Sequence, residues 1–272
     1  MAHAQIAAFA RLAGENEQPV RLLAGQKTLL ARTMHDIRYD AVHDEMLVTN
    51  PFAKAIMTFR GGADGEEAPI RIIQGPQTQL GSNTDRLDVD PVHDEIYIPN
   101  RNAILVFPRE AEGDVAPIRI IQGPDTRLRR AGSLAVDPIN NLIVVGFSPF
   151  ENERGGLLIF NRTDSGNVKP RAVIQGPKTE IHRINQIQVY PPKGWIVATQ
   201  PGIIDEQEPE GVFIGVWSVN DHGDVPPRWK IGGPKSLMKK PRGVALNPKH
   251  KELIVADMRL NSVLTYYFPE MF

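Results

Sequence analysis

Several polar residues hold matching places in a repeated part of this sequence, and their types could carry out acid–base chemistry. His35 and Asp36 are adjacent, and Arg86 stands one repeat later. A histidine beside a carboxylate can move protons near neutral pH, and an arginine can hold a substrate carboxylate. His35, Asp36 and Arg86 are therefore candidate catalytic residues.

The same positions could also bind a metal. Asp85, Asp88 and Asn185 supply hard oxygen ligands, and His35 supplies an imidazole, so that one divalent cation could be held between them. A water-filled channel with mutually satisfied polar side chains is the alternative. The sequence leaves both interpretations open, and it predicts no cofactor other than such a cation.

A second group of candidates lies in charged loops. Two connections are long, residues 148–156 and 200–211, and they contain Phe150, Glu151, Arg154, Asp205 and Glu206. The connections from strand four to strand one, expected on the same face, are basic in three successive repeats and contain Arg129, Arg130, His182, Arg183, Lys239 and Arg242. Insertions confined to one face of a repeat protein often mark its binding face, and mixed charge suits a protein partner or a small anionic ligand. Ordinary solvated charge is the alternative interpretation.

A segment that recurs five times must position these residues. It reads PVRLLAGQKT from Pro19, PIRIIQGPQT from Pro69, PIRIIQGPDT from Pro117, PRAVIQGPKT from Pro170 and PPRWKIGGPK from Pro226. The intervals are 50, 48, 53 and 56 residues, measured between Gly25, Gly75, Gly123, Gly176 and Gly232. Each period contains short β-branched runs separated by turn residues, which is typical of strands. Four antiparallel strands per period make one propeller blade.

The sequence therefore predicts an all-β fold, a β-propeller of four-stranded antiparallel blades that spans residues 1–272 as a single domain. Five blades fit the first, second and fourth strands, and six is the alternative because six third strands are found. N-terminal strands are expected to complete the C-terminal blade and close the ring, which removes exposed edges. Connections from strand four to strand one, and from strand two to strand three, should emerge on the same face. When the first strands are aligned, His35 and Asp85 fall in one ring of positions around the axis, Asp36 and Arg86 fall in the next ring, and Arg38 and Asp88 fall in a third.

An apolar strand, an Asp-Pro turn, "EIYI", "ILVF" and then "GD·APIR·I·GP·T·L" follow one another in the repeat, which resembles bacterial NHL-type β-propeller repeats. The resemblance covers essentially the whole chain and extends to streptogramin lyase-like and gluconolactonase-like propellers. It implies the architecture, because such propellers serve as binding platforms, lyases, lactonases and interaction modules. Lactonase-like members hold a metal in the central channel with carboxylate and Asn ligands, and that pattern is not matched residue by residue here.

Composition narrows the classes of partner. The net charge is −1, and aromatic residues are scarce in the basic loops, which argues against nucleic acid. No apolar run approaches about 20 residues and no signal peptide is recognised, so a soluble, cytoplasmic protein without membrane insertion is expected. If residue 1 is an engineered start, an extracytoplasmic location is expected instead. The absence of cysteine excludes disulfides and thiolate metal sites.

The sequence contains no HExxH, GxSxG, GxGxxG or GxxxxGK motif. It therefore favours a non-enzymatic binding or scaffold propeller, whose loops 148–156 and 200–211 bind a protein partner or a small anionic ligand. Such a protein could also be a component of a larger complex. The alternative is a lyase- or lactonase-type enzyme with a central-channel site, with or without a divalent metal.

Overall fold

A computed structural model describes residues 4–32, 34–82, 84–148, 153–203 and 210–272. In these ranges the regular structure consists of β-strands joined by turns, and the helices are 3-10 turns of three residues each. None of the helices in the described ranges has the length and apolar character needed to cross a membrane.

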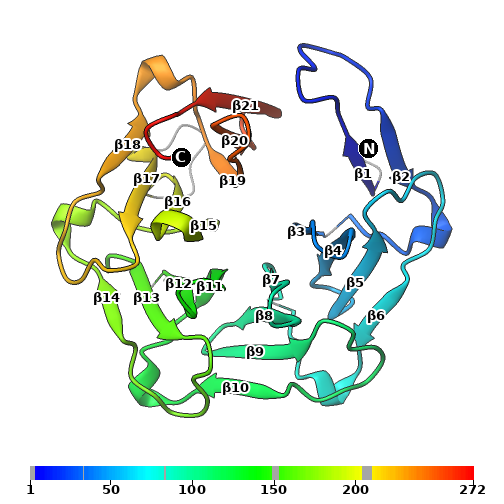
Figure 1. Ribbon diagram of the computed structural model, residues 1–272, viewed down its shortest axis with the longest axis horizontal. Helices are drawn as coiled ribbons and strands as arrows, with labels where there is room; N and C mark the ends of the chain where they lie inside the picture. The colour runs from blue at the N-terminus through cyan, green and yellow to red at the C-terminus, as the bar shows by residue number, and fades with distance from the viewer. Residues whose placement is uncertain (1–3, 33, 83, 149–152, 204–209) are drawn as a thin grey trace. The chain divides into compact units, whose positions relative to one another are not determined.

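The strands form one hairpin, four four-stranded sheets and one three-stranded sheet (Figure 1). The hairpin contains β1 (Gln5–Ala8) and β2 (Arg21–Ala24). The first two four-stranded sheets contain β3 (Ile37–Asp40), β4 (Glu45–Asn50), β5 (Ala55–Arg60) and β6 (Arg71–Gln74), and then β7 (Asp88–Asp90), β8 (Glu95–Asn100), β9 (Ala103–Pro108) and β10 (Arg119–Gln122).

The next two four-stranded sheets contain β11 (Ala131–Asp137), β12 (Leu142–Phe147), β13 (Gly156–Asn161) and β14 (Ala172–Ile174), and then β15 (Ile187–Tyr190), β16 (Trp195–Pro201), β17 (Val212–Ser218) and β18 (Trp229–Gly232). The three-stranded sheet contains β19 (Pro241–Asn247), β20 (Glu252–Asp257) and β21 (Ser262–Tyr267). Consecutive strands in these sheets pair antiparallel.

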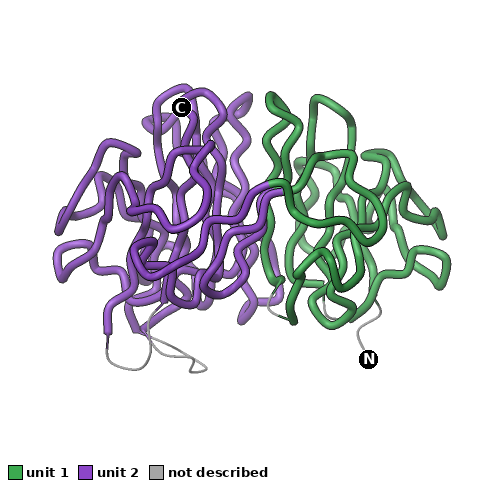
Figure 2. The backbone as a smooth tube through the Cα atoms, turned by 90° about the horizontal axis from the view of Figure 1, so that it is seen from below, with its two compact units in different colours: residues 1–96, 107–118 green, residues 97–106, 119–272 purple. Residues whose placement is uncertain are grey.

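Two compact units divide the chain (Figure 2). Unit 1 contains residues 1–96 and 107–118, and unit 2 contains residues 97–106 and 119–272. Each unit is described by itself below. The single domain expected from the sequence stays a prediction.

The predicted fold class is confirmed: the protein is an all-β propeller with five antiparallel blades. The fifth blade contains β19, β20 and β21 in one sheet. Its completion by the N-terminal strands involves elements of different units, and it stays a prediction.

The middle strands of the blades form the core of unit 2. β12 is buried along its whole length, and β13 is buried except at its last residue. Phe160 and Trp217 are fully buried within two apolar clusters that join consecutive sheets of this unit. Burying each such aromatic side chain contributes about 1.5–3 kcal/mol, so these strands form a rigid support for the loops at their ends.

The recurring Gly-Pro-x-Thr segment fastens one blade to the next. Gly123 has φ 135° and ψ 170°, a conformation that is essentially restricted to glycine. Thr126 Oγ1 donates to Gly123 O at 2.6 Å, and the Asp125 N–H donates to Asn167 Oδ1 at 2.8 Å in the following blade. A Cβ added to Gly123 would lie 2.6 Å from Asn167 Cγ. The recurrence of glycine at this position is therefore explained by its place at the junction of two blades.

The same clasp recurs within each unit. In unit 1 the Gln77 N–H donates to Asp114 Oδ1 at 2.7 Å, and in unit 2 the Lys178 N–H donates to Asp224 Oδ1 at 2.7 Å. Beside the clasp formed by Gly123, a parallel bridge joins Ile121 to Gly166. At Gly75, Gly123 and Gly176 an added Cβ would collide with the acidic or amide side chain of the clasp, whereas at Gly232 the nearest atom is Val212 O of the same sheet at 3.0 Å.

Candidate functional site

In unit 1 the first strands of two neighbouring blades bring polar ring positions together. His35 Nδ1 lies 2.7 Å from Asp85 Oδ1, and the two side chains are 45% and 42% exposed. Arg38 Nε donates to Asp88 Oδ1 at 3.1 Å. The members of each pair are 50 residues apart in the sequence, so the alignment of first strands gives the correct register at these positions.

Asp36 is buried and holds backbone rather than the imidazole of its neighbour. Its Oδ2 accepts from the Leu87 N–H at 3.1 Å, and its own N–H donates to Thr49 Oγ1 at 3.1 Å. Arg38 Nη1 lies 3.7 Å from Asp36 Oδ1. Asp36 therefore fastens β3 to the segment that enters β7, and the imidazole of His35 has Asp85 as its partner.

Arg86 is a fixed positive charge beside this pair. Burial lowers its pKa from the ordinary value, against the opposing influence of Asp36 and Asp85. Its Nη1 donates to the carbonyl oxygen of His35 and, at 3.1 Å, to that of Asp85. A guanidinium remains protonated in proteins, so Arg86 orders the backbone on both sides of the His35–Asp85 pair.

Within unit 1 the predicted ligands His35, Asp85 and Asp88 do not form a metal-binding cluster. Among the described residues, no cluster of three or more His, Cys, Asp or Glu side chains could hold a metal ion. Asp85 and Asp88 contact His35 and Arg38. Asn185 belongs to unit 2, where its N–H donates to Thr199 O at 3.0 Å. The divalent cation stays a prediction.

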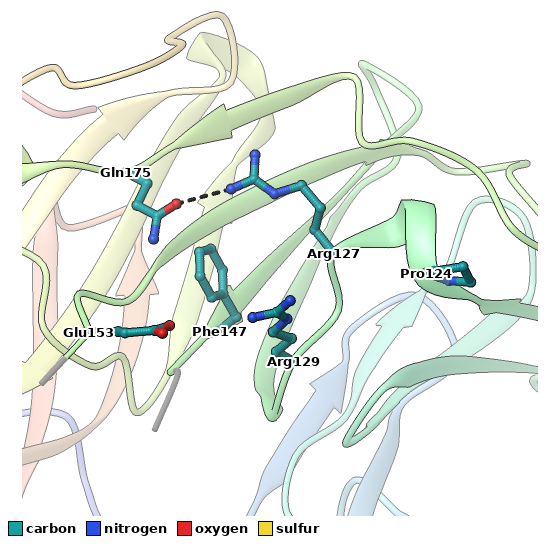
Figure 3. Close-up of a pocket in the computed structure, with 6 residues that line it drawn as sticks. All are labelled: Pro124, Arg127, Arg129, Phe147, Glu153 and Gln175. Atoms are coloured by element: carbon teal, nitrogen blue, oxygen red, sulfur yellow. Dashed lines mark hydrogen bonds between the residues drawn. The ribbon is translucent and has the colours of Figure 1, made fainter. Parts of the chain in front are cut away.

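A pocket of 210 Å³ lies in unit 2, at the loops that follow β10, β12 and β14 (Figure 3). Its lining consists of Pro124, Arg127, Arg129, Phe147, Glu153 and Gln175. Pro124 begins the 3-10 turn η3 (Pro124–Thr126), Phe147 ends β12, and Gln175 follows β14. The connections from strand four to strand one and from strand two to strand three, which were expected on one face, therefore both line this pocket of unit 2.

Local backbone geometry turns the two pocket arginines outward. Arg127 follows η3 in the left-handed conformation with φ 59°, and the Leu128 N–H donates to Thr126 Oγ1 at 3.2 Å. Leu128 is buried, whereas Arg127 and Arg129 on either side of it are exposed. Because Leu128 anchors the segment in the core, the flanking guanidiniums are presented at the pocket.

Hydrogen bonds through Gln175 connect two of the pocket loops. Arg127 Nη2 donates to Gln175 Oε1 at 3.1 Å, and Gln175 Nε2 donates to Arg154 O at 2.9 Å. Arg154 also lies close to the next blade, because its Nη1 is 3.1 Å from His182 Nε2. Side-chain hydrogen bonds of Gln175 and Arg154 therefore hold this edge of the pocket in place.

The network continues into the neighbouring blade. The His182 N–H donates to Gln200 Oε1, and Gln200 Nε2 donates to Gly211 O at 2.6 Å. Burial, together with the charge of Arg154, lowers the pKa of His182. The imidazole is then neutral at pH 7, and its Nε2 can accept from the Arg154 guanidinium. The two long connections are thus joined through one histidine.

Two opposite charges in the pocket have no partner in the described part of the chain. Arg129 and Glu153 both line the cavity, and neither forms a hydrogen bond or an ion pair with a described residue. Both side chains are exposed, so water satisfies them when the pocket is empty. They are the groups in this pocket with most capacity to bind a ligand.

The structure brings together some of the predicted loop residues. Arg129 lines the pocket, and Arg154 and His182 stabilise its edge. The Arg130 N–H donates to Asn102 Oδ1 at 3.4 Å, and the Lys239 N–H donates to Asp257 Oδ2 at 2.8 Å. Arg183 and Arg242 are half-buried, the latter within β19. Phe150, Glu151, Asp205 and Glu206 lie outside the described residues.

Phe147 and Gln175 are among the pocket residues that the sequence did not single out. Phe147 ends a buried strand, so its pattern indicates core. Gln175 occupies the repeated position before Gly-Pro, where Gln74 stands in unit 1 and donates to Ala53 O at 2.9 Å. The sequence signal for its second role is only the long connection, residues 148–156, that precedes it in the same repeat.

Comparison with protein-family models and with curated proteins finds no match. Among solved structures, hydrazine synthase from Kuenenia stuttgartiensis is similar, with a TM-score of 0.58 and 13% sequence identity. The match covers 93% of this chain and 68% of that chain. At this identity the likeness shows the fold alone, a β-propeller, and the NHL-type assignment stays a prediction.

Proposed function

We propose that this protein is a binding β-propeller that takes an anionic group in the pocket of unit 2. One observation carries the proposal: Arg127 and Arg129 line the same cavity, and Arg129 has no acceptor among the described residues. A planar guanidinium with several N–H donors is well suited to bind a carboxylate or phosphate. The bound group would lie against the Phe147 side chain, which lines the same pocket.

The size of the pocket limits the ligand. The pocket volume is 210 Å³. Drug-sized ligands usually occupy about 300–1,000 Å³, so a small molecule or a single acidic side chain fits better. The shared chemistry is a carboxylate, supplied either by a free metabolite or by an acidic residue of a protein partner.

Calorimetric titration at low salt tests the proposal with two probes, succinate and a short Asp-rich peptide. Removing one charged hydrogen-bond donor should cost about ten-fold or more in affinity, so Arg129→Met should bind both probes much more weakly. Arg171→Met is the matched control, because Arg171 is exposed and precedes β14, whereas Gln175 follows that strand. The control should bind like the wild type.

The two arms distinguish the source of the carboxylate. Tighter binding of the peptide supports a protein partner, and tighter binding of succinate supports a free ligand. If neither probe binds, or if Arg129→Met binds as well as Arg171→Met, the proposal is wrong.

A second candidate function is a lyase- or lactonase-type activity in unit 1. It is supported by the half-exposed His35–Asp85 pair at 2.7 Å, because a carboxylate orients an imidazole that acts as a base. A panel of lactones and of β-eliminable esters should then be turned over, with and without Mg²⁺ or Ca²⁺. His35→Gln should abolish the turnover and leave succinate binding unchanged; turnover that survives His35→Gln refutes this candidate.

A further inference from the structure

The pocket of unit 2 contains two opposite charges that have no partner among the described residues. In the same unit Lys230 and Glu180 form an ion pair at 2.8 Å. Arg129 and Glu153 line one cavity of 210 Å³, and neither forms such a pair with a residue that the structure describes. Figure 3 draws them on opposite sides of the Phe147 ring. Their separation leaves space for a ligand that contacts both.

The chemistry of the lining determines what that ligand carries. A ligand with carboxylates alone would be attracted by Arg127 and Arg129 but repelled by Glu153. A ligand with an ammonium alone would be attracted by Glu153 but repelled by the two arginines, since like charges in a partly enclosed site are disfavoured. Only a molecule with both kinds of group satisfies every charged side chain in the pocket.

We infer that the pocket binds a small acidic amino acid, with its carboxylates on Arg127 and Arg129 and its ammonium on Glu153. This inference rests on the proposed function and names its ligand class. The charges match group by group, because two guanidiniums and one carboxylate face two carboxylates and one ammonium. Arg127 gives one N–H to Gln175, and a guanidinium has five, so donors remain for the ligand.

The ring of Phe147 adds to the match. Phe147 is 5% exposed and lines the pocket, so one part of its ring is open to a bound molecule. The short apolar chain of an acidic amino acid can lie on this ring while its charged groups reach the sides. An ammonium near an aromatic face is also attracted by the ring quadrupole, which favours the zwitterion over the simple diacid.

Aspartate and succinate make the decisive comparison, because they differ only in the amino group. Calorimetric titration of the full chain should show aspartate binding about ten-fold more tightly than succinate, as expected for one charged hydrogen bond. Glu153→Gln keeps the size of the side chain and removes its charge, so it should bring the two affinities together. Glu270→Gln, an exposed carboxylate that lies outside the pocket lining, is the matched control and should keep the preference.

The outcomes separate this inference from the function on which it rests. If succinate binds through Arg129 and aspartate binds no more tightly, the anion site stands and the amino-acid inference is overturned. A preference for aspartate that persists in Glu153→Gln overturns it as well. If neither aspartate nor succinate binds the wild type, the inference is wrong, and the proposed function is wrong as well unless the Asp-rich peptide binds. Tighter binding of aspartate than of succinate supports both, provided that Glu153→Gln removes the preference and Arg129→Met weakens the binding of both ligands.

Discussion

Replacement of Gly123 by alanine tests whether the repeated segment is a blade-to-blade clasp. The conformation of Gly123, with φ 135° and ψ 170°, costs a residue with a side chain about 1–3 kcal/mol. The new Cβ would lie 2.6 Å from Asn167 Cγ, so Asn167 must move away. Its two contacts with Asp125, at 2.8 and 3.0 Å, would then be lost, and the first alone is worth about 0.5–1.5 kcal/mol. Together these terms predict a loss of about 2–4 kcal/mol of unfolding free energy.

Gly166 provides the matched control for this substitution. It also has a positive φ, 71°, but a Cβ built on it meets nothing within 4 Å. Gly166→Ala therefore has only the left-handed backbone cost of about 1–2 kcal/mol. Urea unfolding followed by circular dichroism should give a lower midpoint for Gly123→Ala than for Gly166→Ala, with equal slopes.

A double-mutant cycle with Asn167→Ala isolates the steric part. If the clasp is correct, the double variant Gly123→Ala/Asn167→Ala loses less stability than the sum of the two single variants, because the clash is absent. Equal costs for Gly123→Ala and Gly166→Ala, or strict additivity in the cycle, would refute the reasoning. Succinate binding adds a functional readout, since the clasp directly precedes the loop that presents the two pocket arginines.

Three further predictions concern single side chains. The pKa of His182 is lowered from 6.5, so on acidification the unfolded chain binds a proton before the folded chain does. The unfolding free energy should therefore fall between about pH 7 and about pH 5. Urea unfolding at both pH values should show a smaller fall for His182→Gln than for the wild type. Burial raises the pKa of Tyr266 to about 12, and its hydroxyl donates to Ser236 O at 2.6 Å. The unfolding free energy should then fall between about pH 10 and about pH 12, because the tyrosine ionises first in the unfolded chain. Tyr266→Phe should remove the contribution of this residue to the fall. Ultraviolet absorbance of the phenolate can verify that Tyr266 ionises late in the folded protein. Arg86→Met should lower the unfolding free energy by about 0.5–1.5 kcal/mol, because the carbonyl oxygens of His35 and Asp85 lose a shared donor, and an unchanged unfolding free energy would contradict the bonding described.

The repeat predicted the fold well because its cause is local and occurs many times. Short β-branched runs, turn residues and a fixed period identify strands even where one blade is degenerate, as in the segment around Ile231. The alignment of first strands also placed His35 opposite Asp85 and Arg38 opposite Asp88. Register follows from repetition, since each blade presents the same strand position to its neighbour.

The side-chain partners within the site were harder to predict. His35 and Asp36 precede β3, where buried Asp36 accepts from the Leu87 N–H and half-exposed His35 contacts Asp85, so adjacency in sequence did not make them a pair. Gln175 stands at a position that the repeat also fills with Gln74 and Gln122, and Phe147 ends a buried strand, so neither pattern indicates a pocket. A pocket depends on which loops contact one another, and a repeat in the sequence carries little information about contacts between loops of different length.

The position of the pocket follows from a device that the blades share. In unit 1 the amide of Gln74 donates to Ala53 O and fastens a short turn to the outer strand. In unit 2 the equivalent amide of Gln175 donates to Arg154 O, which lies at the end of a longer connection. The longer connection therefore keeps the glutamine hydrogen bond that the short turn has. Glu153, which directly precedes the bonded residue Arg154, lines the cavity. A blade built in this way can acquire a ligand-binding group without disturbing its sheet, which is why the charged pocket lies beside a long connection and not at one of the short turns.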